Sequence, residues 1–159
     1  VLPLSQCVGR GTGLDDSGLQ RKLAVLMQAL EANAGASEPL AVLAAFGGFE
    51  VAMLCGAVME AATQNRVIVV DGFIVTSAVL VAQALQPGVL ERCVFSHQSD
   101  ESGHARLLSH LGAQPLLHLG LRLGEGSGAA LAWPLIVSAA RILTEMASFE
   151  SAGVSGQER

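Results

Sequence analysis

The sequence predicts an α/β fold, a three-layer Rossmann-like parallel sheet flanked by helices. A compact β-branched run at 67–70 and a second short run at 92–95 alternate with helical patterns, and a third run at 116–119 continues the order. Such alternation implies right-handed crossovers and parallel strands. Three strands make a thin sheet, so we expect the chain to be part of a larger fold.

Helical patterns fill most of the remaining sequence. Asp15, Asp16 and Ser17 form a capping signal before the first of them. Glycines or a proline bound several of the others, as expected for helix ends. The helices are predicted at 19–32, 38–46, 49–65, 73–85, 104–111 and 129–146, followed by an irregular tail at 147–159.

The length of 159 residues predicts one domain, residues 1–159, and the composition predicts that it associates with other protein surface. Hydrophobic residues make up 51% of the chain and charged residues only 14%. Small residues in the helix at 49–65 favour close helix packing, so we expect a homodimer. A net charge of −5 with a single lysine argues against a nucleic-acid partner, which requires clustered cations.

A membrane span is not expected. The longest apolar stretch is residues 72–85, about 14 residues with Thr76, Ser77 and Gln83 inside it, whereas a spanning helix needs roughly 20. No charged-then-apolar signal segment begins the sequence, so a cytoplasmic location is the default expectation.

Neither a metal site nor a cofactor is expected. Cys7, Cys55 and Cys93 form no C-x-x-C pair, which fits free thiols in a reducing compartment. The four histidines lie seven, six and eight residues apart, so none are paired at the i, i+4 spacing typical of a helical metal site.

A glutamate among glycines, at 124–128, is the strongest functional signal. It follows an apolar run and precedes the last predicted helix, whose N-terminus offers unpaired N–H groups and a partial positive charge. Glycines allow close approach of a ligand, but the carboxylate of Glu125 has the wrong sign for a simple phosphate cradle. It suits a base that removes a proton from a neutral or cationic nitrogen beside a phosphate. A tight turn with a solvated glutamate is the plain alternative.

Other readings of single residues remain open at this point. Gly124-x-Gly126-x-x-Ala129 fits a dinucleotide fingerprint, but no second strand with a terminal acidic residue follows within the sequence. Asp71 at a strand end is typical of a turn or helix cap. Lys22 could contact a phosphate, and Ser96 could donate a hydroxyl hydrogen to a substrate.

Six segments together resemble nicotinate-nucleotide–dimethylbenzimidazole phosphoribosyltransferases, in the family's order. The segment at 119–129, Leu-Gly-Leu-Arg-Leu-Gly-Glu-Gly-Ser-Gly-Ala, is specific, and the others would be weak alone. They are Gly-Arg-Gly-Thr-Gly-Leu-Asp-Asp at 9–16, Phe-Gly-Gly-Phe-Glu at 46–50, Val-Asp-Gly-Phe-Ile at 70–74, Phe-Ser-His-Gln-Ser at 95–99 and Gly-His at 103–104. Family members are about twice this long, and their first half, which holds most of the benzimidazole pocket, has no counterpart in this sequence, so the chain resembles their C-terminal half.

The resemblance implies a reaction in cobalamin lower-ligand synthesis. Members of this family transfer phosphoribose from nicotinate mononucleotide to 5,6-dimethylbenzimidazole, giving α-ribazole 5′-phosphate and nicotinate. Glu125 matches their catalytic base, while much of the benzimidazole pocket belongs to the other half. The residues expected to bind substrate are Lys22, Ser96, Gly124, Gly126, Ser127 and Gly128.

Two alternatives differ in class from this enzyme. One is a non-catalytic fragment that keeps the fold and dimer surface, and the other is an unrelated nucleotide-binding module.

Overall fold

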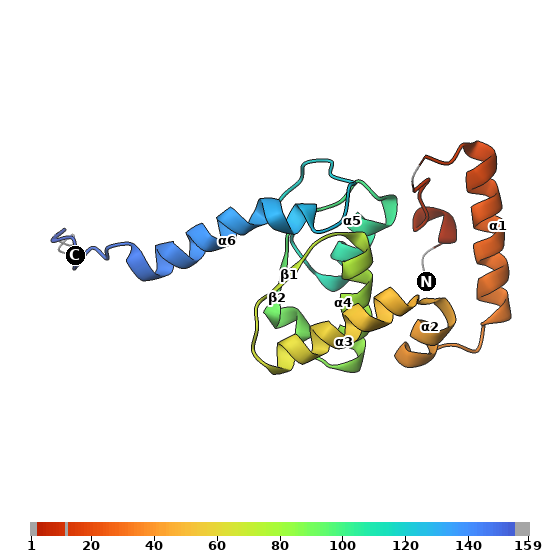
Figure 1. Cartoon of the computed structure of the whole chain (residues 1–159), viewed down its shortest axis with the longest axis horizontal. Coiled ribbons are helices and arrows are strands. Elements are labelled where there is room, and N and C mark those ends of the chain that lie inside the picture. Colours follow the sequence, from red (N-terminus) through yellow and green to blue (C-terminus); the bar gives the residue numbers. More distant parts are fainter. Residues whose placement is uncertain (1–2, 12, 155–159) are drawn as a thin grey trace, which may run out of the picture.

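Helices surround two short parallel strands at the centre of the molecule (Figure 1). The computed structural model describes residues 3–11 and 13–154. Its elements are η1 (Leu4–Gln6), α1 (Asp16–Ala32), α2 (Pro39–Phe46), α3 (Phe49–Thr63), β1 (Ile68–Val70), α4 (Phe73–Leu85), η2 (Val89–Arg92), β2 (Cys93–Phe95), α5 (Ser102–Leu111) and α6 (Ser127–Glu145).

The sheet consists of β1 and β2, paired in parallel with Val70 opposite Phe95. Both of these residues are buried, as expected for strands covered on both faces. The α/β class with a parallel sheet is therefore confirmed.

The third predicted strand, at 116–119, is wrong as a regular strand. It forms a single parallel bridge, His97 with Leu117, although Leu116 N–H also donates to the Phe95 carbonyl at 2.9 Å. Pro115 offers no N–H, and Gly120 turns away with a φ of +63°. The run between them is too short for a ladder, so only a strand-like edge remains.

The core lies between α3, α4 and the sheet. The helix α4 contributes Ala78, Val79 and Ala82, each fully buried, and α3 contributes Cys55 and Val58. Their small side chains let the two helices pack closely.

The small residues of α3 that were expected to pack lie on its other side. Ala52, Gly56 and Ala57 are all exposed in this structure. The helix expected to pack against these residues is absent from the described chain.

Helix boundaries follow the capping residues. Asp15 Oδ1 accepts a 2.7 Å hydrogen bond from Gly18 N–H, so α1 begins at Asp16, three residues earlier than predicted. Gly112, with a φ of +64°, ends α5. The predicted α4 and α2 agree with the structure to within one residue.

The last helix, α6, projects from the body of the molecule (Figure 1). It is the one helix of the described chain that is long and apolar enough to cross a membrane by length and composition. The core helix of a globular protein passes the same test. The longest apolar helix is thus α6 rather than 72–85, and residues 147–154 after it form only turns. Residues 155–159 of the predicted tail lie outside the described part.

Candidate active site

A cavity of about 530 Å³ opens beyond the carboxyl ends of the strands, where parallel α/β sheets bind ligands. The loop after β1, the loop after β2 and the glycine loop at 124–128 all contribute to its wall. The wall also includes Lys22 of α1 and two residues of the segment before the glycine loop, Arg122 and Leu123. The lining residues that bear functional groups are Lys22, Asp71, His97, Ser99, Glu101, Arg122 and Glu125.

The backbone around Glu125 is left-handed over three successive residues. Gly124, Glu125 and Gly126 have φ values of +77°, +57° and +81°. For a residue with a Cβ this conformation costs on the order of 1 kcal/mol, so the surroundings must hold it. Apart from the chain neighbours, no atom of the described chain lies within 4 Å of where a Cβ on Gly124 or Gly126 would be, so the turn faces open space and Glu125 is exposed.

Asp71, directly after β1, holds this turn against the sheet. Its Oδ2 accepts a 3.1 Å hydrogen bond from Gly126 N–H, and its Oδ1 accepts a 3.0 Å bond from Ala129 N–H. The carboxylate therefore caps the N-terminus of α6, where negative charge is favourable. Asp71 is a helix cap, as its position suggested, but for a helix 55 residues further along the chain.

His97 fills the space behind the turn. Its side chain is 1% exposed, and a Cβ on Gly128 would overlap its imidazole ring. Ser96 Oγ donates to the Asp71 carbonyl at 2.9 Å, so it accepts from His97 Nδ1, 3.2 Å away. The same Nδ1 lies 3.9 Å from Asp71 Oδ1. Only a glycine at 128 allows α6 to begin here.

A second buried histidine, His104, links α4 to the loop after β2 by hydrogen bonds. Thr76 Oγ donates to the Gly72 carbonyl at 2.8 Å and so accepts from His104 Nε2, 3.0 Å away. His104 Nδ1 accepts from Ser99 N–H at 2.9 Å. Burial, reinforced by His97 nearby, lowers the pKa of His104 to about 4, against a smaller opposing effect of Asp71. The ring is neutral near pH 7, in agreement with its role as both donor and acceptor.

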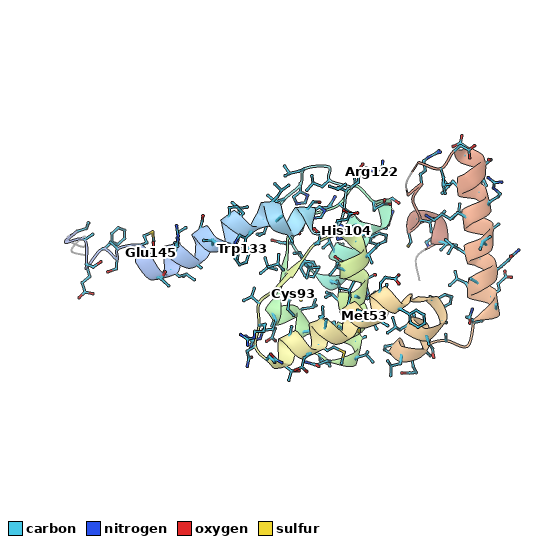
Figure 2. The ribbon with its side chains drawn as sticks, viewed as in Figure 1. Met53, Cys93, His104, Arg122, Trp133 and Glu145 are labelled. Atoms are coloured by element: carbon cyan, nitrogen blue, oxygen red, sulfur yellow. The ribbon has the colours of Figure 1, made fainter. Side chains whose placement is uncertain are left out.

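Two cations stand on the cavity wall. Lys22 is half-buried and donates to the Gly9 carbonyl at 2.9 Å. Arg122 donates to the Gly11 carbonyl and lies at the loop that faces the N-terminal segment (Figure 2). Both bind neutral carbonyls in this structure, so their charges remain available to an anion in the cavity.

Four of the seven predicted site residues meet at this cavity: Lys22, Gly124, Glu125 and Gly126. The other three lie behind the wall. Ser96 is completely buried, Gly128 packs on His97, and Ser127 Oγ is buried without a hydrogen-bond partner in the described chain. Their predicted contacts with substrate stay predictions.

Sequence reasoning did not select Ser99, His97 or Arg122 for the site. Ser99 and His97 belong to the polar loop after β2, and Arg122 stands two residues before Gly124. Position at the carboxyl edge was the available signal for the first two. For Arg122 the available signal was its place in the family-like segment at 119–129.

Comparison with known proteins gives matches over nearly the whole chain. A family model described as Phosphoribosyltransferase matches residues 1–154. The nicotinate-nucleotide–dimethylbenzimidazole phosphoribosyltransferase of Variovorax paradoxus is 65% identical over 157 residues, which is 99% of this chain and 45% of that protein. The enzyme of the same name from Cupriavidus necator is 63% identical over 97% of this chain and 44% of its own length.

Solved structures agree with these relatives. A crystal structure of CobT from Thermus thermophilus matches with a TM-score of 0.90 and 44% identity, covering 97% of this chain and 46% of that one. The chain therefore spans less than half the length of the proteins it matches. With a family model that extends over residues 1–154, the chain belongs to the phosphoribosyltransferase family that this model describes.

Proposed function

We propose that this chain forms part of an enzyme that transfers phosphoribose from nicotinate mononucleotide to 5,6-dimethylbenzimidazole. Family membership supports the transferase class, and the names of the relatives support the two substrates. The observation that carries the proposal for this chain is the exposed carboxylate of Glu125, held on a strained turn at a cavity that also presents Lys22 and Arg122. The cytoplasmic location also remains a prediction.

Glu125 is the proposed general base. Its carboxylate takes the proton from one ring nitrogen of the benzimidazole, and the other nitrogen attacks the anomeric carbon of the ribose. The bond from that carbon to the nicotinate nitrogen breaks, and its electron pair leaves with nicotinate. The negative charge nearby also favours a transition state in which the ribose carbon becomes positive. Proton and electrons balance without a cofactor.

The cations are proposed to hold the phosphate. Because Asp71 already occupies the positive end of α6, the phosphate is better placed near Lys22 and Arg122 than at the glycine loop. The backbone of Gly124 and Gly126 then lines the nucleotide. Ser99, which lies on the wall, is a closer candidate for a substrate hydroxyl contact than the buried Ser96.

Homodimer formation is part of the proposal. Large apolar side chains are exposed along α6, and small residues are exposed on α3. Surfaces of this kind are typical of protein interfaces. Family membership disfavours the unrelated nucleotide-binding module, whereas the non-catalytic fragment remains the competing function because the chain spans less than half of its relatives.

The test uses the complete gene product with nicotinate mononucleotide and 5,6-dimethylbenzimidazole. Chromatography should detect ribazole phosphate and nicotinate in equal amounts. Glu125→Gln should lower turnover by about 10²–10⁴ and leave nucleotide binding nearly unchanged, because only proton removal is lost. A variant that keeps most of its turnover would remove Glu125 from the role of base.

The 159-residue chain alone serves as a second arm of the same experiment. Without the remaining half the two reactants are not held for attack, and such positioning can be worth ~7–11 kcal/mol of the barrier. We expect weak nucleotide binding and no measurable product. Turnover at ordinary enzyme rates would show that this chain is sufficient.

A further inference from the structure

We infer that Asp71 is the residue that positions the Glu125 carboxylate, and that it acts through the backbone rather than as a proton acceptor. This inference rests on the proposed role of Glu125. It concerns a second acidic residue of the same cavity, which the comparisons leave without a function.

The hydrogen bonds of Asp71 bracket the catalytic turn. One carboxylate oxygen holds Gly126 N–H, immediately after Glu125, and the other holds Ala129 N–H, in the first turn of α6. The turn beside them includes the left-handed Glu125. Two bonds to a single rigid carboxylate fix both the height and the rotation of this turn relative to β1.

Asp71 is itself fixed to the sheet. Its side chain is 12% exposed, and its carbonyl accepts from the buried hydroxyl of Ser96. Ser96 N–H in turn donates to the carbonyl of Val70 at the end of β1. The route from the sheet to Glu125 therefore runs through hydrogen bonds of 2.9 to 3.1 Å.

Because the backbone at Glu125 is strained, its position depends on these hydrogen bonds. A left-handed glutamate between two left-handed glycines returns to commoner conformations when its restraints are removed. A displacement of about 1 Å can lower a rate by about 10²-fold when reactants are held for attack. Loss of Asp71 should therefore displace the base without removing it.

The alternative is that Asp71 takes the proton itself. Both its oxygens already accept amide hydrogens, and His97 Nδ1 is too far away, at 3.9 Å, for a normal hydrogen bond. The carboxylate faces the turn that it caps, whereas Glu125 is exposed at the cavity. Geometry favours the positioning role.

The kinetic test is a double-mutant cycle in the complete gene product. Asp71→Asn replaces one of the two acceptors by an NH₂ donor, and we expect kcat to fall about 10–100-fold with KM changed less than about threefold. On the Glu125→Gln background the same substitution should lower kcat less than about threefold further, because residues that act as one unit are not additive. A full and additive loss would assign Asp71 an independent catalytic role and overturn the inference.

The matched control is Asp15→Asn, which changes the same kind of cap at the start of α1, where Asp15 accepts from Gly18 N–H. It should leave kcat unchanged. If Asp71→Asn does not fold, Asp71→Ser, which keeps one acceptor, takes its place, and a kcat within about twofold of the parent protein would refute the inference.

A second readout does not depend on activity. Amide hydrogen exchange at Gly126 and Ala129 should accelerate at least about tenfold in Asp71→Asn, while exchange at core amides of α4 stays the same. Unchanged exchange would show that Asp71 does not hold the turn, whatever reaction the protein catalyses. If exchange is faster in Asp71→Asn but the parent protein has no transferase activity, Asp71 still restrains the turn and only the proposed function is rejected.

Discussion

The two ends of α6 differ in how completely this chain surrounds them. At the first turn, Asp71 accepts two amide hydrogens, Gly128 packs on His97, and Ala132 is fully buried. From there the helix leaves the body, as the positions of Trp133 and Glu145 show (Figure 2). The exposed fraction is 57% at Trp133 and 87% at Leu143.

This difference separates two kinds of stabilisation. Hydrogen bonds are short and directional, so a few residues of one chain can complete the polar side of the site. Burial of an apolar helix face depends on area, and one side of α6 finds no cover within the described chain. The end near Glu125 is therefore held by contacts within this chain, while much of the far end is exposed.

The largest effect on stability is expected from a methyl group added at the buried end of α6. Gly128→Ala would place a Cβ within the imidazole of His97, which is itself enclosed, so we expect the free energy of unfolding to fall by about 3 kcal/mol. Gly56→Ala on α3 is the control, because beyond its chain neighbours and the backbone of its own helix no described atom lies within 4 Å of its added Cβ, and it should be neutral or stabilising by up to ~1 kcal/mol. Urea unfolding measures both. Equal midpoints for the two variants would contradict the close packing at Gly128.

A charge at the exposed end should change association rather than folding. Leu143→Lys should raise the dimer dissociation constant at least about tenfold and leave the unfolding midpoint of the monomer within experimental error. Ser37→Lys, in the loop before α2, adds the same charge away from α6 and serves as the control. Light scattering over a concentration series measures the mass. A parent protein that stays at 16.3 kDa at micromolar concentration would exclude the homodimer.

The sequence predicted the helices and the position of the site better than the contacts that form it. Apolar periodicity and capping residues placed α2 and α4 almost to the residue. The order of strands and helices was enough to bring Glu125 and the loop after β2 to one edge. These features depend on local pattern or on topology.

What could not be predicted depends on contacts between distant residues. Asp71 was recognised as a possible cap, but nothing near it identifies Gly126 and Ala129 as its partners. The run at 116–119 had strand composition, yet Pro115 and Gly120 limited it to a bridge. Lys22 was selected because it is the single lysine of the sequence. Arg122, on the same wall, was not selected, because arginine is a more common residue type in this chain.

The stability of the fold should depend on pH through His104. Its pKa is about 4 in the fold and near 6.5 in an unfolded chain, so between these values the unfolded chain binds a proton that the native protein excludes. Stability from this residue is complete above about pH 6.5 and declines as the pH falls towards about 4. Protonation would force the ring to give up accepting from Ser99 N–H, which releases the loop after β2. Urea midpoints at about pH 7 and pH 5 should differ less in His104→Gln than in the parent protein, and an equal difference would place the acid sensitivity elsewhere.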